Sequence, residues 1–491
     1  MGFLVQQPKS LETIALSKLT RWITSIALKI VTTNRKDAEE LLSLQIENIR
    51  NYLKCRMPKR FHNKLAAEVI QSLIKQSHRE FFTNTVASVK MGRVIEAFFT
   101  ENLTSLSLEP NTEFFRASLS SKKNLPTELV DLKLLLIENT VNESANVEES
   151  VFTQFIKELH NLKYLILTVC RHFYNIEKML ICVAEHCKMI EELELFSNNL
   201  KDKDMEVVVK MQNLKVINLI CPNITGAGVA TLLLSCKKIE QCNAYGIESA
   251  FERIASIKEH ENIQFNLKSY TSNYRTTLEQ VELIVKMCPQ IEKLSFQRTS
   301  QDCLLLLYEL KHLRELELCN FHFYGDSVRE FLEVGGRNLI TLDLQNVKQI
   351  DLFAMICVSQ ACPNLESMTM AECNLKKQYM RKNLVHCGIN DLQTPPFRSL
   401  KRLTVLVPNW TPLFSNEVTV FLLANCVNIE YIEINVEGLV TDDILLFVLK
   451  WNPLRHLKEL VMSDYLSSAV VNQIIQKCNR TSEMTIYTHE L

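Results

Sequence analysis

The stretch CPNLESMTMAEC, residues 362–373, decides the fold that the sequence predicts. Its apolar residues follow the frame apolar-x-x-apolar-x-apolar, with Leu365, Met368 and Met370 at the apolar positions. Met368 and Met370 alternate with polar residues, as in a short β-strand that has one buried and one exposed face. One such strand cannot be stable alone, so this frame predicts further strands elsewhere in the chain.

The same frame recurs along most of the chain. Weaker copies lie at 128–134, 238–244 and 480–486, and the clear copies are NLTSLSL at 102–108, NLKYLIL at 161–167, MIEELEL at 189–195, NLKVINL at 213–219, QIEKLSF at 290–296, HLRELEL at 312–318, NLITLDL at 338–344, SLKRLTV at 399–405, NIEYIEI at 428–434 and HLKELVM at 456–462. The first apolar position returns at intervals of roughly 22 to 35 residues, the range of leucine-rich repeats. The segments 247–275 and 373–400 match the frame poorly.

Segments between these copies have the three- and four-residue apolar spacing of helices, for example 176–187, 327–336 and 441–452. Asp326 and Thr441 stand where helix N-caps are expected. Each strand and helix would form one repeat, which buries its apolar face only against its neighbours. We therefore predict an α/β leucine-rich-repeat horseshoe, a solenoid, over residues 101–491 with about 14 to 15 repeats, preceded by an all-helical module at 1–100.

The sixteen cysteines fit this repeat. Five of them stand three residues before the first apolar position of a strand: Cys187, Cys236, Cys288, Cys362 and Cys426. Cys170, Cys319 and Cys373 fall near the turn that follows a strand. No Cys-x-x-Cys pair is present, so we expect buried thiols that act as small hydrophobic residues, with no metal site and no disulfide framework.

The chain resembles the cysteine-containing subtype of leucine-rich repeat, whose recurrent pattern is CPNLExLxLxxC. Residues 362–373 are nearly a consensus copy of this pattern. The resemblance covers roughly residues 100–491. It implies the horseshoe fold. Because this subtype is most often the substrate-binding part of F-box-type ubiquitin-ligase receptors, it also implies a cullin adaptor and a client protein as partners.

Residues 1–100 contain no copy of the frame and predict helices at roughly 10–31, 36–54, 58–77 and 85–99. Two apolar stripes stand out. Leu11, Ala15 and Leu19 resemble the elongin-binding box of cullin-2 receptors, although Ala15 occupies a position where Cys is usual. The second stripe resembles an F-box opening or the downstream cullin box and consists of Met57, Pro58, Phe61, Leu65 and Val69.

The resemblance therefore implies an adaptor of the Skp type or of the elongin type. A buried helix also begins with Pro in its first turn and carries one apolar stripe, so residues 1–100 could equally be a cap on the first repeat. The excess of Lys and Arg in this segment, against an excess of Asp and Glu in the remainder, favours two parts with different partners.

Composition and motifs exclude several classes of function. Only 10 of 491 residues are Gly, and Thr225-Gly226-Ala227-Gly228 lacks the remaining residues of a dinucleotide fingerprint. We find no catalytic motif and expect no cofactor and no enzymatic activity. The net charge of −1 and the lack of an 18-residue apolar run predict no nucleic-acid partner and no membrane partner, for a protein of the cytoplasm or nucleus.

Residues between the apolar strand positions should face the concave surface, where such arrays bind proteins. The expected client site combines an early apolar zone with an acidic stripe, which suits a basic client segment with an apolar anchor. Its residues are Tyr164, Ile166, Glu192, Glu194, Phe196, Val216, Ile220, Glu315, Glu317, Asp343, Tyr431 and Glu433.

The hypothesis is a substrate-recognition subunit of a cullin-RING E3 ubiquitin ligase that binds its client on the concave face. The alternative is a scaffold or inhibitor that uses the same horseshoe and recruits no ligase. Adaptor binding by residues 1–100 discriminates between the two.

Overall fold

A computed structural model describes the chain in eighteen stretches. They are residues 11–32, 38–56, 58, 61–80, 85–99, 103–108, 126–136, 152–169, 176–257, 259, 262–272, 276–298, 303–373, 396–406, 416–436, 440–463, 466–477 and 485–488. The chain divides into two compact units, Lys9–Glu261 and Asn262–Leu491 with Met1–Pro8. We call them the first and the second unit.

The first unit begins with four helices, α1 Leu11–Thr32, α2 Ala38–Arg56, α3 His62–Glu80 and α4 Thr85–Glu96. Six parallel strands follow, each paired with the next in chain order: β1 Ser105–Leu108, β2 Asp131–Leu136, β3 Tyr164–Val169, β4 Glu192–Ser197, β5 Val216–Ile220 and β6 Gln241–Ala244. Further helices connect the later strands: α7 Ile176–His186, α8 Met205–Val208, α9 Gly226–Ser235 and α10 Ile247–Ala255.

The second unit repeats this plan with nine parallel strands in chain order. These are β7 Ser269–Thr271, β8 Lys293–Gln297, β9 Glu315–Cys319, β10 Thr341–Gln345, β11 Ser367–Ala371, β12 Arg402–Leu406, β13 Tyr431–Asn435, β14 Glu459–Met462 and β15 Thr485–Thr488. The helices are α11 Leu278–Met287, α12 Val328–Gly335, α13 Leu352–Ala361, α14 Asn416–Asn425, α15 Asp442–Trp451 and α16 Ser468–Lys477, with a short 3-10 helix, Leu304–Glu309, between β8 and β9.

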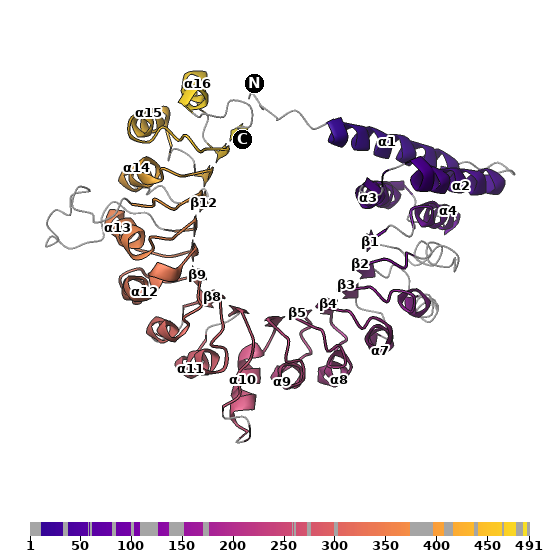
Figure 1. Ribbon diagram of the computed structural model, residues 1–491, viewed down its shortest axis with the longest axis horizontal. Coiled ribbons are helices and arrows are strands. Elements are labelled where there is room, and N and C mark those ends of the chain that lie inside the picture. Colours follow the sequence, from indigo (N-terminus) through magenta and orange to yellow (C-terminus); the bar gives the residue numbers. More distant parts are fainter. Residues whose placement is uncertain are drawn as a thin grey trace. The chain divides into compact units, whose positions relative to one another are not determined.

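Each strand has one face toward the helices and one face away from them (Figure 1). Side chains alternate accordingly: in β3 and β4, every second residue is buried and the residues between them are half-buried or exposed. The register places buried apolar residues of neighbouring strands side by side, as with Leu316, Leu342 and Met368. The chain is thus an α/β leucine-rich-repeat solenoid, as the frame predicts. We call the side of the strands away from the helices the strand face.

Thiols and asparagine side chains donate hydrogen bonds from one repeat to the backbone of the preceding one in several places along the chain. The Sγ atoms of Cys187 and Cys373 lie 3.8 Å and 3.2 Å from the backbone oxygens of Ile156 and Leu344, to which they donate. All five cysteines that precede strands are buried, as predicted. The Asn of the Asn-Leu and Asn-Ile frames has a similar role, because its Nδ2 donates to a backbone oxygen of the preceding repeat in four cases: Asn161 to Thr127, Asn213 to Lys188, Asn364 to Arg337 and Asn428 to Arg398.

The Gly-x-Gly motif serves helix packing. A Cβ at Gly226 would lie 2.7 Å from Cβ of Ser249 on α10, and a Cβ at Gly228 would lie 2.6 Å from Oδ1 of Asp202. Asp202 also accepts a hydrogen bond from the backbone N–H of Thr225. The two glycines therefore permit a close approach of neighbouring repeats, which a side chain would prevent.

One of the two predicted helix N-caps is confirmed and the other is not. Thr441 is the N-cap residue of α15, as expected. The N-cap of α12 is Ser327, not Asp326, because Asp326 instead accepts hydrogen bonds from the backbone and ring of His322. The poorly matching segment 247–275 contains helix α10 and strand β7, so regular secondary structure forms there despite its weak frame.

The helical module packs directly on the first repeat. The Nδ2 of Asn63 on α3 donates to Thr104 Oγ1 (2.6 Å), and the Thr104 N–H donates to Asn63 Oδ1 (2.8 Å). Within the module, Arg50 and Glu96 form an ion pair of 2.9 Å in which both side chains are largely buried. This packing places the four helices in the same compact unit as β1–β6.

Candidate functional site

Across β3 to β6, the strand face of the first unit has three rows of side chains, one residue per strand, because the parallel register aligns equivalent positions. Asp131, Lys133 and Leu135 of β2 extend the same three rows. The first row is Tyr164, Glu192, Val216 and Gln241; the second is Ile166, Glu194, Asn218 and Asn243; the third is Thr168, Phe196 and Ile220. Tyr245 directly follows β6 and continues the third row. A ligand that crosses the strands would meet one row at a time.

Apolar side chains on this face are more exposed than is usual for residues of their kind. Tyr164 is 37% exposed, Ile220 44% and Tyr245 40%, and Ile166, Phe196 and Val216 are half-buried. We call these six residues the apolar strand face. They come from four adjacent strands or strand ends, and Phe196, Ile220 and Tyr245 are neighbours in the third row. Exposed apolar residues gathered in this way mark an interaction surface.

Carboxylates and amides lie among these apolar residues. Asn243 Nδ2 donates to Asn218 Oδ1 (2.7 Å), and Asn218 Nδ2 lies 3.5 Å from Glu194 Oε2. Gln241, Asn243 and Tyr245 were not singled out from the sequence because the frame at 238–244 is weak. The signal was present, since Ile239, Cys242 and Ala244 occupy the apolar positions and leave these three residues on the strand face.

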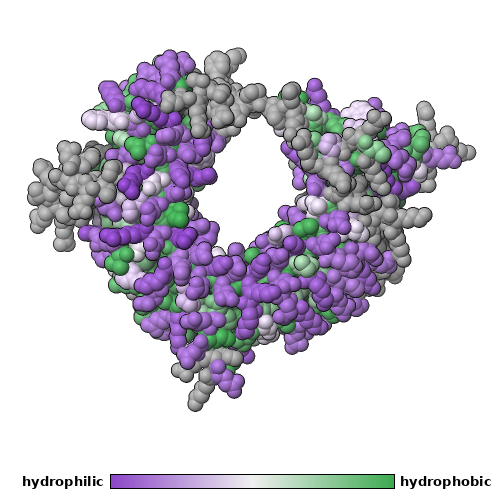
Figure 2. All heavy atoms as spheres, viewed as in Figure 1, coloured by the Kyte–Doolittle hydropathy of each residue, from purple (hydrophilic) through white to green (hydrophobic). Residues whose placement is uncertain are grey.

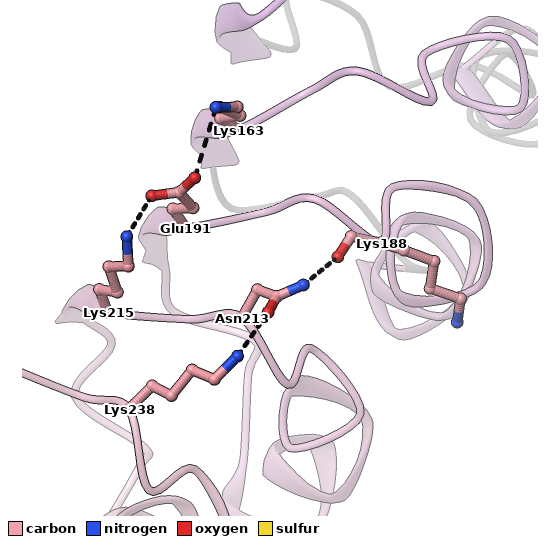
Figure 3. A network of polar contacts seen from close by, with 6 residues as sticks. All are labelled: Lys163, Lys188, Glu191, Asn213, Lys215 and Lys238. Atoms are coloured by element: carbon pink, nitrogen blue, oxygen red, sulfur yellow. Dashed lines mark hydrogen bonds and ion pairs between the residues drawn. The ribbon is translucent and has the colours of Figure 1, made fainter.

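A row of alternating charges directly precedes the strands (Figure 3). Glu191 accepts from Lys163 on one side (3.5 Å) and from Lys215 on the other (2.7 Å). The hydrogen bond from Lys215, together with the charge of Lys163, lowers the pKa of Glu191. The second unit repeats the alternation through Lys401, which pairs with Glu366 at 2.8 Å, and Lys458, which pairs with Glu430.

The acidic residues expected to form a stripe lie partly in the first unit and partly in the second. Glu192 and Glu194 lie on β4, and the aligned residues of the neighbouring β3 and β5 are all uncharged. Glu315, Glu317 and Asp343 lie on β9 and β10 of the second unit, with Glu317 directly opposite Asp343. We call these three residues the acidic cluster. Lys293 Nζ, 3.1 Å from Glu315 Oε2, partly neutralises it.

Electrostatic repulsion and burial are visible in the acidic cluster. Burial raises the pKa of Asp343, and the charges of Glu317 and Glu315 add to this effect. Burial beside the same carboxylates raises the pKa of the Cys319 thiol to about 12. A cationic ligand would relieve this repulsion, so the cluster favours a positively charged partner.

Tyr431 and Glu433 on β13 form a smaller polar group on the strand face. The Tyr431 hydroxyl donates to Glu433 Oε2 at 2.7 Å, and the Arg402 guanidinium lies 5.2 Å from the centre of the Tyr431 ring. The Tyr431 hydroxyl and the Glu433 carboxylate are therefore already partnered with each other.

The predicted adaptor-binding residues divide by burial. Leu65 and Val69 are fully buried in the module, where they contribute to its core. Helix packing therefore covers both side chains, and an adaptor could contact them only after the module rearranges. Phe61 is half-buried and Pro58 is exposed, while Met57 lies outside the described residues.

The competing stripe on α1 faces outward. Ala15 is exposed and Leu19 is half-buried, whereas the Leu11 side chain lies outside the described residues. Ile14 and Trp22 on the same helix are exposed, Trp22 by 62%. We call Ile14, Ala15, Leu19 and Trp22 the α1 surface. Sequence reasoning missed Trp22 as a surface residue because an apolar-periodic helix does not reveal which side packs inward.

Hydrophilic residues cover most of the visible surface, and hydrophobic residues appear as small patches (Figure 2). Within the described residues, no group of His, Cys, Asp and Glu could hold a metal ion. Nor does any described helix have the length and apolarity needed to cross a bilayer.

No family model and no curated protein matches the chain. Among solved structures, a complex of Rad7 and Elc1 in yeast is similar at 15% identity and a TM-score of 0.44, over 98% of both chains. A complex of TLR13 with ssRNA13 is similar at 14% identity and a TM-score of 0.34, over 75% of this chain and 59% of the other. At these scores neither neighbour carries an argument about function.

Proposed function

We propose that the chain is a non-enzymatic substrate-recognition subunit of a cullin-RING E3 ubiquitin ligase in the cytoplasm or nucleus. The helical module would bind a cullin adaptor, and the strand face would bind a client protein. The ligase component would supply the chemistry, and this chain would supply affinity and geometry.

The observation that carries the proposal is the presence of two exposed apolar surfaces on one compact unit. The α1 surface and the apolar strand face both belong to Lys9–Glu261. Exposed apolar groups at two places on one unit suit a protein that joins two partners. The resemblance of the Leu11, Ala15 and Leu19 spacing to an elongin-binding box supports the assignment of the first surface.

Burial favours an elongin-type adaptor over a Skp-type adaptor. The Skp-type alternative depends on the stripe that includes Leu65 and Val69, and both would have to leave the module core to contact a partner. Ala15 and Trp22 need no such rearrangement. Rigid docking without exposure of core residues is the less costly route.

On the client side, we propose a basic segment with an apolar anchor. The apolar strand face would bind the anchor, and Glu192 and Glu194 lie beside it for a Lys or Arg of the same segment. The acidic cluster of the second unit offers a further contact of the same sign.

The test is direct binding of the full chain to purified elongin-type and Skp-type adaptors, measured by calorimetry. The wild type should bind the elongin-type adaptor, and Ala15→Asp should abolish this binding by placing a charge at the centre of an apolar contact. Val89→Asp on α4 is the matched control, because Val89 is exposed and lies outside the α1 surface.

Both variants should keep the circular dichroism spectrum and melting temperature of the wild type, because both positions are exposed. If the wild type binds neither adaptor, the ligase proposal is wrong and the scaffold alternative replaces it. Binding of the Skp-type adaptor alone would instead reject the α1 surface.

A further inference from the structure

Several helices of this solenoid expose charged residues on the side away from the strands, although α9 and α13 contain no charged residue. In α7, for example, Glu177, Lys178 and Glu185 are exposed, while the apolar residues pack inward. This amphipathic pattern is what a solvated helix requires. Against it, the outer sides of α14 and α15 in the second unit stand out.

The outer side of α14 is apolar. Val420 and Ala424 are half-buried, and Val427, just beyond the helix end, is 47% exposed. The helix sequence NEVTVFLLAN contains one charged residue, near its start. A helix that is apolar on all sides is usually covered on all sides.

The outer side of α15 is more apolar still. Phe447 is 46% exposed and Trp451 is 71% exposed, and Ile444 is half-buried one turn before Phe447. These residues share one face because they are three or four positions apart. Helices α14 and α15 pack side by side on the same side of the strands (Figure 1). We call Val420, Ala424, Val427, Ile444, Phe447 and Trp451 the outer patch.

Two opposite charges flank the aromatic residues on α15. Asp443 and Lys450 are both exposed, one turn before and one turn after Phe447. No described residue forms an ion pair with either side chain. They are seven residues apart, about 10 Å along the helix axis, with Phe447 next to their midpoint.

This arrangement is complementary to itself. If α15 meets a second α15 in antiparallel orientation about a two-fold axis near Phe447, Asp443 lies opposite the partner's Lys450 and Lys450 lies opposite the partner's Asp443. Both charges then gain partners, and both Phe447 rings lie at the centre. In a parallel arrangement, like charges would face each other.

We propose that the outer patch is a homodimer interface, in which a second copy of this chain covers α14 and α15. The charge pattern identifies the partner that covers the outer patch as a second copy of the chain. Asp443 and Lys450 lie at matched distances from Phe447, and only a two-fold partner makes use of that match. The proposal does not depend on the ligase assignment.

The experiment is analytical ultracentrifugation of the full chain over a dilution series. The wild type should show a monomer–dimer equilibrium. Trp451→Gln should raise the dimer Kd by about a hundredfold, because loss of an aromatic anchor costs about tenfold or more and a two-fold interface contains it twice. Val334→Gln, at an apolar residue of α12 that is 64% exposed, is the control and should leave the Kd unchanged.

Charge exchange tests the antiparallel geometry itself. Asp443→Lys and Lys450→Asp should each weaken the dimer, since each places two like charges in contact, and the double variant should restore it. A wild type that stays monomeric at every concentration, or a dimer that tolerates Trp451→Gln, overturns the proposal. Failure of the double variant to recover binding rejects the antiparallel pairing and with it the assignment of a second copy as the occupant.

Discussion

Leu342→Ala tests the stacking of repeats most directly. Leu342 on β10 is fully buried, and the register places it between Leu316 on β9 and Met368 on β11. The substitution removes three carbon atoms, which corresponds to about 2.4 kcal/mol of lost transfer free energy at about 0.8 kcal/mol per methylene. Strands on both sides prevent the cavity from closing, so we expect a total loss of about 3 to 4 kcal/mol.

The assay is equilibrium urea denaturation of the full chain, followed by circular dichroism. Leu305→Ala is the matched control: it removes the same three carbons from a side chain that is 43% exposed, and it should cost less than about 1 kcal/mol. Hydrogen exchange should also become faster in β9 and β11, because contacts in a solenoid are between neighbours. Equal losses of stability in the two variants would refute the repeat register.

Further predictions concern reactivity and binding. The buried thiols of Cys288, Cys362 and Cys426 should react with thiol reagents only after unfolding, whereas the exposed Cys55 should react at once. Rapid labelling of any of the three buried thiols in the native protein would contradict the packing. Phe196→Ala should weaken binding of a validated basic client by more than about 1 kcal/mol in calorimetry, through loss of an apolar anchor. Replacing Glu315 and Glu317 by Gln should mainly slow association and reduce its salt dependence in stopped-flow experiments, and unchanged rates would remove the acidic cluster from the client site. Affinity for a cationic peptide should be full above the raised pKa of Asp343 and should fall as the pH drops through it, because protonation removes the charge that attracts the peptide; a flat pH profile would contradict this.

The fold was predictable from the sequence because it depends on local repeats of few residue types. A frame such as NLESMTM at 364–370 fixes both the strand and the side that each residue faces, and Cys362 stands at a regular position before that frame. Secondary structure also forms where the frame matches poorly, because α10 and β7 lie in the segment 247–275. The apolar spacing that remains there was sufficient to bury residues such as Phe251 and Tyr270.

Sites were less predictable than the fold because exposure depends on packing between segments. The stripe with Leu65 and Val69 has the same spacing as an exposed stripe would have, and only the contacts of α3 with the rest of the module show that it is buried. Likewise, the sequence predicts Asp326 as an N-cap, but its carboxylate instead pairs with Arg298 from an earlier segment and with the nearby His322. Helix periodicity gives a face, and tertiary packing decides which way that face points.

The charges before the strands alternate in sign from one repeat to the next, so the pattern has a period of two repeats. Glu366, Lys401, Glu430 and Lys458 directly precede four successive strands, and each charge has an opposite charge before the neighbouring strand. Loss of the single repeat that contains Lys401 would bring Glu366 beside Glu430, whereas loss of two successive repeats would bring Glu366 beside Lys458. Within this stretch, the chain can therefore shorten or lengthen more easily by pairs of repeats than by one.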